Sequence, residues 1–359
     1  MMMPRLIRVL ITDDSSMARG LLRAILEEEE GIEVIGEACH GKEALEMVQR
    51  LQPDLVTMDL DMPVMGGMEA IEEIMHTKAV PILVVSGQSD AEKAYEALRL
   101  GALEVINKPA YTPDEAAEFV AKVRLLSGIP MITHLRRKAL VSPVIAPVDF
   151  FAIIKQPDFK QVFVIASSTG GPQALASLLP QLDEHFPAPI LIAQHMSDGF
   201  VSGMAHWLST LCKLPVKVAE EGEILKPGQV YVSPSEQHLT ITGSHQIHLK
   251  PCLEKDIYHP SCDQLLKSVA QAYGKNAVGI ILTGMGRDGA AGMAAIDAHG
   301  GVTLAQDEAS SVIYGMNQEA VNAGVVHRVL PLSEIAAEML KVLQLQPAGY
   351  LAALRRGQL

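Results

Sequence analysis

The first 126 residues alternate short apolar runs with amphipathic stretches, and this alternation constrains the fold more than any other feature. Strand-like runs are expected at five places: Leu6–Thr12, Ile32–Ala38, Asp54–Met58, Pro81–Val85 and Ala102–Asn107. Helical stretches separate them, near Ser15–Glu30, Lys42–Arg50, Met68–Thr77, Ala91–Leu100 and Pro113–Leu126. Five strand–helix units in succession predict a doubly wound, five-stranded parallel sheet.

Polar side chains follow four of these predicted strands, at the point where each strand ends. Asp13 and Asp14 follow the first strand, Asp59 the third, Ser86 the fourth and Lys108 the fifth. Because ligands bind at the carboxyl ends of parallel strands, we expect these side chains to share one pocket. Each of them alone also fits a turn or a helix cap. Together they predict a phosphoryl-accepting site, with Asp59 as the nucleophile and Asp13 and Asp14 as ligands of Mg²⁺.

This first region resembles a response-regulator receiver domain from residue 6 to about residue 126. The resemblance rests on the motifs V-L-I-T-D-D, M-D-L-D-M-P, V-V-S-G and N-K-P. It implies phosphorylation of Asp59 by a partner histidine kinase, and Mg²⁺ bound by Asp14, Asp59 and the backbone carbonyl of Asp61. Receivers often carry an aromatic residue three positions before the lysine, where this chain has Val105. We therefore expect the phosphorylation signal to leave through a different surface rearrangement.

Residues 128–160 interrupt the pattern with prolines and the basic triplet Arg136, Arg137, Lys138, and they predict an interdomain linker. A second α/β pattern follows, with its strongest strand-like runs at Val162–Ala166, Ile190–Gln194 and Val278–Thr283. Short β segments are expected at Val216–Val218, Gln229–Ser233 and His238–Leu249. With these segments the sheet is expected to be mainly parallel but mixed. The predicted domains are therefore 1–127 and 161–350.

Three residues of complementary chemistry follow the three strongest strands of this second region. The first strand leads into S-S-T-G-G-P, with Ser168 at a sharp turn before a helix that starts near Pro172. His195 follows the second strand directly, and Asp288 lies in the loop after the third. A nucleophile, its base and the carboxylate that orients the base need such convergence. We therefore predict a triad of Ser168, His195 and Asp288.

Alternatives stay open at this point. The T-G-G sequence also fits a phosphate-binding loop, although the lysine of such loops is missing. Ser167 is an adjacent candidate that the sequence barely separates from Ser168. His245 and His248 are weak evidence for a metal site. The four cysteines show no C-x-x-C spacing, so they predict neither a zinc site nor a redox motif.

Residues from about 160 to 345 resemble the catalytic domain of protein-glutamate methylesterases. The matching motifs are A-S-S-T-G-G-P, Q-H-M-S-D-G-F and A-V-G-I-I-L-T-G-M-G-R-D-G-A-A-G-M. With the receiver included, the whole chain is similar to chemotaxis response-regulator methylesterases. The resemblance implies Ser168 as nucleophile, His195 as general base and Asp288 as the triad acid. It also implies that Thr169 and Met285 shape an oxyanion hole.

Two segments depart from this family's pattern. Tyr258–Asp263 reads Y-H-P-S-C-D where the family has H-R-P-S-x-D, and Gly315–Gln318 reads G-M-N-Q where the family has G-M-P-R. If these segments line the substrate cleft, they alter receptor preference. Neither is expected to touch the triad.

The formal net charge of −13 argues against a nucleic-acid partner, because phosphate binding needs a basic surface. No apolar run approaches the roughly 18 residues of a membrane span. The N-terminus is expected to form the first strand and not a signal peptide. We therefore expect no nucleic-acid partner, no membrane insertion and a cytoplasmic location.

The function expected from these features is that of a phosphorylation-regulated serine hydrolase acting in sensory adaptation. It would demethylate glutamyl methyl esters and deamidate glutamines on methyl-accepting chemotaxis receptors, with a chemotaxis histidine kinase as phosphodonor. Mg²⁺ is expected for receiver phosphorylation, and no cofactor for ester hydrolysis. The unphosphorylated receiver is expected to cover the cleft. Two other hypotheses stay open: a phospho-dependent binding module with a vestigial triad, and a serine esterase or amidase of another chemotaxis-like pathway.

Overall fold

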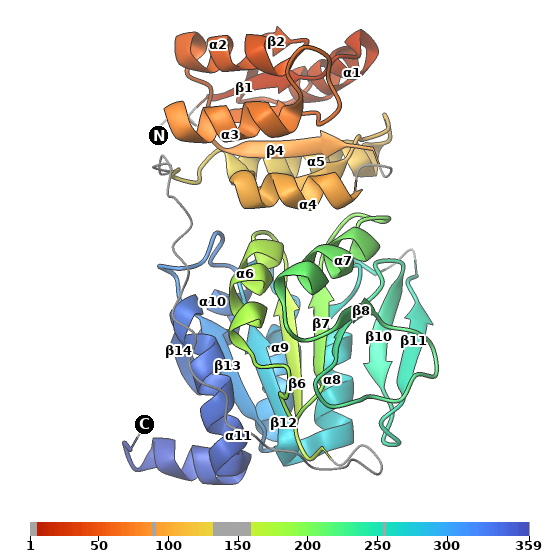
Figure 1. Cartoon of the computed structure of the whole chain (residues 1–359), viewed down its shortest axis with the longest axis vertical. Coiled ribbons are helices and arrows are strands. Elements are labelled where there is room, and N and C mark those ends of the chain that lie inside the picture. Colours follow the sequence, from red (N-terminus) through yellow and green to blue (C-terminus); the bar gives the residue numbers. More distant parts are fainter. Residues whose placement is uncertain (1–5, 88–90, 132–158, 254–255, 359) are drawn as a thin grey trace. The chain divides into compact units, whose positions relative to one another are not determined.

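The computed structural model describes residues 6–87, 91–131, 159–253 and 256–358. The chain divides into two compact units, Met1–Ile153 and Ile154–Leu359, and each has its own parallel sheet (Figure 1). Most of the predicted linker, including the triplet Arg136 to Lys138, lies outside the described residues.

The first unit is the predicted doubly wound domain. Its strands are β1 (Ile7–Thr12), β2 (Ile32–Ala38), β3 (Leu55–Met58), β4 (Ile82–Ser86) and β5 (Glu104–Asn107). Its helices are α1 (Ser16–Glu27), α2 (Gly41–Leu51), α3 (Gly67–Thr77), α4 (Ala91–Leu100) and α5 (Pro113–Leu126). The strand order is β2-β1-β3-β4-β5, and all pairings are parallel. The predicted five-stranded parallel sheet is confirmed.

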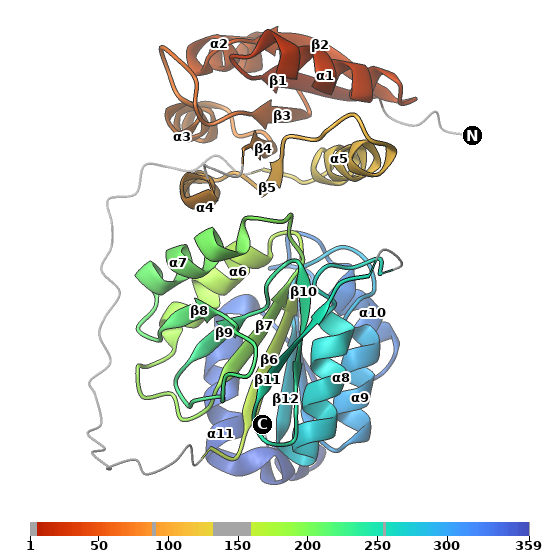
Figure 2. The ribbon, with the colours of Figure 1, turned by 90° about the vertical axis from the view of Figure 1, so that its right-hand side faces the viewer.

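The local sequence explains how these elements form. β3 and β4 are buried along their whole length, because helices α1 and α5 cover one face of the sheet and α2, α3 and α4 the other (Figure 2). Strands buried on both faces need continuous apolar sequence, as in I-L-V-V. The Ser15 hydroxyl accepts a hydrogen bond from the Ala18 N–H at 3.3 Å and caps α1.

The second unit holds a seven-stranded sheet in the order β14-β13-β12-β6-β7-β9-β8. Its strands are β6 (Val162–Ser167), β7 (Ile190–Gln194), β8 (Val216–Val218), β9 (Val230–Val232), β12 (Ala277–Ile281), β13 (Val302–Gln306) and β14 (Arg328–Leu330). Its helices are α6 (Gly171–Leu178), α7 (Val201–Leu211), α8 (Cys262–Tyr273), α9 (Ala290–Ala298), α10 (Met316–Asn322) and α11 (Leu332–Arg355), and α11 breaks at Gln346 before Pro347. Short 3₁₀ turns follow α6 at Leu179–Gln181 and α8 at Gly274–Asn276. Helices α6, α7 and α11 cover one face and α8, α9 and α10 the other (Figure 2).

The expectation of a mixed sheet in this unit is wrong. Every pairing in the seven-stranded sheet is parallel. The antiparallel segment forms a separate hairpin of β10 (Gln237–Ile241) and β11 (Ile247–Pro251). This hairpin packs one face against α8, with Leu239, Ile241 and Ile247 in the core, so it does not need an edge of the main sheet.

The parallel order has a direct consequence for function. β6 is the central strand of the second sheet and lies between β12 and β7, so the loops after these three strands leave the same edge side by side. Within the described ranges, no helix is both long and apolar enough to cross a bilayer.

Candidate active site

Ser168 lies in a tight turn between β6 and α6. Its backbone N–H donates to the carbonyl of Thr283 at 3.0 Å, which joins the turn to the end of β12. Gly170 adopts a φ of +78°, and a Cβ there would lie 2.6 Å from the Val312 Cβ. A Cβ on Gly284 would lie 2.7 Å from the Ser168 Cβ. The glycines of T-G-G and T-G-M are therefore required for the turn that presents Ser168.

The surroundings of Ser167 and Ser168 differ. Ser167 is fully buried, and its hydroxyl donates to Gln194 Oε1 at 2.7 Å. Among the residues that the structure describes, none accepts a hydrogen bond from the Ser168 hydroxyl. Ser167 is therefore committed to holding β6 against β7, and Ser168 is the better placed of the two serines to react.

His195 and Asp288 are joined at the same edge. His195 follows β7, and its N–H donates to the Ser167 carbonyl at 3.0 Å, so it sits beside Ser168. Its ring Nε2 lies 2.8 Å from Asp288 Oδ2. In a neutral imidazole this pairing has Nε2–H as the donor and leaves an acceptor lone pair on Nδ1. Of the two hydrogen bonds expected in the predicted triad, the one between His195 and Asp288 is present, whereas none joins Ser168 to His195.

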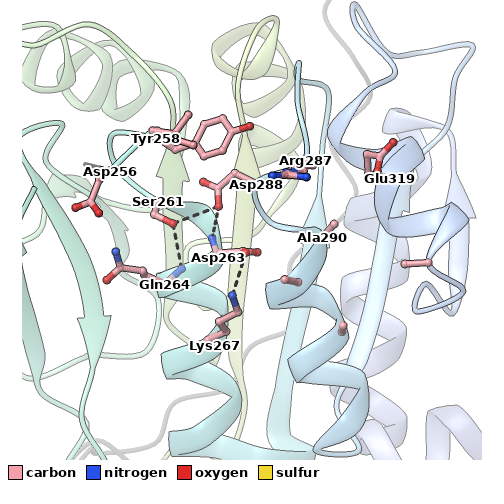
Figure 3. Close-up of a pocket in the computed structure, with 14 residues that line it drawn as sticks. Asp256, Tyr258, Ser261, Asp263, Gln264, Lys267, Arg287, Asp288, Ala290 and Glu319 are labelled. Atoms are coloured by element: carbon pink, nitrogen blue, oxygen red, sulfur yellow. Dashed lines mark hydrogen bonds and ion pairs between the residues drawn. The ribbon is translucent and has the colours of Figure 1, made fainter. Parts of the chain in front are cut away.

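The Asp288 carboxylate is held by the N-terminus of α8. It accepts hydrogen bonds from the Ser261 hydroxyl at 3.2 Å and from the backbone N–H of Asp263 at 2.9 Å (Figure 3). It also accepts one from the backbone N–H of Cys262 at 2.6 Å. Burial raises the pKa of Asp288, but its hydrogen bonds with His195 and with these amides outweigh that effect. The pKa therefore lies below its ordinary value of 3.8. Asp288 stays ionised and can stabilise an imidazolium.

The expectation that Tyr258–Asp263 stays away from the triad is wrong. The Tyr258 ring stacks on the His195 ring, with centroids 5.1 Å apart and planes 12° apart. Cys262 Sγ lies 3.5 Å from His195 Nε2, in addition to the contacts that Ser261, Cys262 and Asp263 make with Asp288. Sequence reasoning missed these contacts because they join parts of the chain that are 25 to 67 residues apart.

Thr169 and Met285, predicted to shape an oxyanion hole, lie in the two loops that flank Ser168. Thr169 is buried, and its carbonyl accepts a hydrogen bond from the Thr283 hydroxyl at 2.9 Å. Met285 is half exposed beside Gly284. The other segment that departs from the family's pattern is Gly315–Gln318. Its Asn317 is fully buried, and the Asn317 amide donates to the Gln306 carbonyl at 3.0 Å. Its amide therefore does not line a cleft.

A pocket of about 620 Å³ opens beside Asp288. Tyr258, Ser261 and Asp288 border it on one side, and α8, α9 and α10 supply the rest, with Lys267, Arg287 and Glu319 among its charged residues (Figure 3). Helix α9 contributes only small side chains, Ala290, Ala291 and Ala294. The pocket therefore gives solvent a path to the Asp288 side of the histidine–aspartate pair.

The receiver unit gathers its predicted acidic residues as well. Carboxylate oxygens of Asp13, Asp14 and Asp59 lie within 4.8 Å of one another, a spacing that suits a hard cation with oxygen ligands. Lys108 Nζ lies 2.7 Å from Asp13 Oδ2 and 3.2 Å from Asp59 Oδ1. Burial and the Asp13 charge raise the pKa of Asp59 from 3.8 to about 6, against the opposing effect of Lys108.

Of the remaining predicted residues, Ser86 and Asp61 lie in the receiver unit, and His245 and His248 lie in the second unit. Ser86 is fully buried at the end of β4, and Asp61 is exposed and paired with Lys93 at 2.9 Å. His245 and His248 do not converge, because His245 bonds the Tyr273 hydroxyl and His248 bonds Glu221.

Comparisons with known proteins agree with both units. The CheB methylesterase family model matches residues 163–339, and the response regulator receiver domain model matches residues 9–121. The protein-glutamate methylesterase/protein-glutamine glutaminase 3 of Paramagnetospirillum magneticum is 52% identical over 340 residues, covering 94% of this chain and 96% of that protein. A relative of the same description from Myxococcus xanthus, numbered 4, is 41% identical and covers 93% of this chain and 96% of its own length.

A solved structure supports the second unit. The crystal structure of the Thermotoga maritima CheB methylesterase catalytic domain is 35% identical, with a TM-score of 0.50, and it covers 51% of this chain and 99% of that chain. Over 94% of its length the chain is 52% identical to one relative of this description. Its two units match the receiver and the methylesterase family models, so both comparisons point to the same family. This chain belongs to the protein-glutamate methylesterase/protein-glutamine glutaminase family, as a two-domain response regulator.

Proposed function

We propose that this protein is a serine hydrolase, switched by phosphorylation, that demethylates glutamyl methyl esters and deamidates glutamines on chemotaxis receptors. The 2.8 Å hydrogen bond between His195 Nε2 and Asp288 Oδ2, at the strand end next to Ser168, is the observation that carries the proposal. It supplies an oriented base next to Ser168 at the end of the central strand, and acyl transfer requires such a base.

The tautomer assigns the proton transfers. Since Nε2–H donates to Asp288, the lone pair of Nδ1 accepts the Ser168 proton as Oγ attacks the γ-carbonyl of the substrate. The imidazolium then protonates the departing methanol, or ammonia when the substrate is a glutamine. Water attacks the acyl-enzyme with the same base and releases glutamate. Catalytic hydrogen bonds are often long before substrate binds, and the Ser168–His195 bond is expected to form in the complex.

The tetrahedral intermediate needs donors for its oxyanion. We assign this role to the loops of Thr169 and Met285, whose backbones flank Ser168 on two sides. Helix α6 starts at Gly171, so its N-terminal dipole adds positive potential at the same place.

The test is methanol release from methylated receptor fragments by the full chain. Ser168→Ala should lose nearly all activity and should no longer react with a fluorophosphonate. Ser167→Ala is the matched control and should keep both properties at a reduced level. Activity or labelling that survives in Ser168→Ala overturns the triad, and an inert parent protein favours a phospho-dependent binding module.

The receiver is proposed to be the switch. Asp59 would accept the phosphoryl group from a histidine kinase, and Lys108 and Ser86 would contact its oxygens. Asp13, Asp14, Asp59 and the Asp61 carbonyl would hold Mg²⁺, which neutralises the clustered charge when bound. Esterase activity of the parent should rise with a small-molecule phosphodonor, whereas Asp59→Asn should not respond. An equal response in both proteins removes Asp59 from the switch.

The domain limits and location complete the proposal. We take residues 1–127 as the receiver, 128–160 as the linker and 161–350 as the catalytic domain, with the cytoplasm as the compartment shared with the kinase and the receptor substrates. Limited proteolysis of the full chain should cut first within 128–160, and stable fragments with other ends would move these limits.

A further inference from the structure

A thiol lies against the histidine–aspartate pair. Cys262 is the first residue of α8 and is fully buried. Its Sγ lies 3.5 Å from His195 Nε2 and 3.4 Å from the carbonyl of Ala193. Serine hydrolysis as proposed above has no use for this sulfur.

Three different ligand atoms meet at this point. His195 Nε2, Cys262 Sγ and an oxygen of Asp288 all lie within 4.8 Å of one another. Nitrogen, thiolate sulfur and carboxylate oxygen form a typical ligand set for Zn²⁺, which takes four ligands in a tetrahedral arrangement. Cysteine spacing in the sequence gives no sign of the site, because its ligands come from three separate segments.

The distances suit zinc. Ordinary Zn–N and Zn–S bonds at a tetrahedral angle place the nitrogen and the sulfur about 3.6 Å apart. The observed separation of His195 Nε2 and Cys262 Sγ is 3.5 Å. The separation between Nε2 and Asp288 Oδ2 is 2.8 Å and must widen by roughly 0.5 Å to span a bound ion.

We propose that His195, Cys262 and Asp288 form an inhibitory Zn²⁺ site within the active site. Binding releases the thiol proton of Cys262 to solvent. The imidazole proton moves from Nε2 to Nδ1, so that Nε2 ligates the ion. A protonated Nδ1 cannot accept the Ser168 proton, and the ion also engages the carboxylate that orients the ring. The inhibition therefore rests on the proposed triad, whereas zinc binding does not.

The pocket beside Asp288 reaches the site from the side of that carboxylate. Asp288, Ser261 and Tyr258 border it, and a water from this pocket would complete the coordination. Among the described residues, a second candidate group with a cysteine consists of Cys39, His40 and Glu43 in the receiver unit, and it provides an internal comparison.

The experiment measures esterase rates of the full chain against buffered free Zn²⁺, with saturating Mg²⁺ to occupy the acidic receiver pocket. Each variant is compared with its own rate in chelator. We expect more than tenfold inhibition of the parent. Cys262→Ser and Cys262→Ala should raise the half-inhibitory zinc concentration at least tenfold, and Cys39→Ser should not change it. Equal inhibition of the parent and both Cys262 variants overturns the proposal.

Direct binding separates this proposal from the proposed function. Co²⁺ replaces Zn²⁺, and a cysteine ligand gives a sulfur-to-cobalt charge-transfer band in the near ultraviolet. A variant that keeps only Cys262, with Cys39, Cys212 and Cys252 changed to serine, should show this band, and so should Ser168→Ala. Loss of the band in the Cys262-only variant overturns the site. A band without any esterase activity supports the site and refutes the proposed catalysis.

Discussion

Asp59 and Asp288 are both buried carboxylates at the carboxyl edge of a parallel sheet, yet their environments move their pKa values in opposite directions. Asp59 faces another carboxylate, Asp13, and burial together with that charge raises its pKa to about 6. Asp288 faces two backbone amides, a hydroxyl and an imidazole, and its pKa lies below 3.8. The same position in the same kind of fold therefore gives two kinds of acid.

The difference shows what each carboxylate can do. Lys108 does not offset the combined effect of burial and of the Asp13 charge on Asp59, so a bound cation would stabilise its ionised form. Asp288 has its lone pairs engaged by donors, so it is held as a fixed anion beside the imidazole of His195. Uncompensated negative charge around a carboxylate thus favours reaction, whereas hydrogen bonds to all its lone pairs favour a fixed position.

The largest expected effect concerns Asp288. Asp288→Asn should lower kcat for ester hydrolysis by about 10³- to 10⁴-fold, because an amide favours the wrong imidazole tautomer and confronts the helix N–H groups with its own donor. Asp256→Asn is the control, since Asp256 bonds a different histidine, the buried His238, at 2.9 Å. Steady-state kinetics on both variants decide the matter, and equal losses would mean that Asp288 acts only through stability.

The second prediction concerns Asp59, and here the substitution is expected to stabilise the protein and not to impair it. Its pKa is raised from 3.8 to about 6, so the folded receiver loses stability as the pH rises between these values. Asp59→Asn removes this cost and should raise the free energy of unfolding of the receiver at pH 7.5 without Mg²⁺ by about 1–3 kcal/mol. Hydrogen exchange of β3 and β4 amides in the full chain measures it, with β6 as the control strand. Slower exchange in the parent would show that the Lys108 pairing dominates.

The third prediction tests the donors around Asp288. Ser261→Ala removes one hydrogen bond of 3.2 Å, worth about 1 kcal/mol, and should lower the esterase rate about fivefold. The pKa of Asp288 should rise, so the loss should be greater at acidic pH. Because Ser261 also caps α8, Ser261→Thr serves as the rescue variant. A pH-independent loss would indicate a capping effect alone.

The smallest effect is expected at Tyr258. Tyr258→Leu removes the ring stacked on His195, worth about 0.5–1 kcal/mol, and should lower kcat about two- to fivefold. Tyr258→Phe keeps the ring and should stay near the parent rate. If both variants behave alike, the stacking has no part in holding the imidazole.

Sequence reasoning reached much of this arrangement because strand ends are visible in apolar patterns. Asp59 follows the run L-V-T-M and His195 the run I-L-I-A-Q, both mainly apolar, and parallel pairing brings such positions to one edge. It failed for the loop that begins at Tyr258, because nothing in the local pattern indicates that a helix N-terminus will meet a loop after another strand. It also failed for the β10–β11 hairpin, since alternating segments indicate strands and not the sheet that receives them.

The contact between Asp288 and α8 has a consequence for how the activity depends on temperature. The first turn of a helix is where its hydrogen bonds open most readily. At Cys262 and Asp263 that turn supplies two of the donors that keep the carboxylate in place. If this turn opens on heating before the rest of the unit unfolds, Asp288 loses two of its donors, and the activity should then fall reversibly below the melting point.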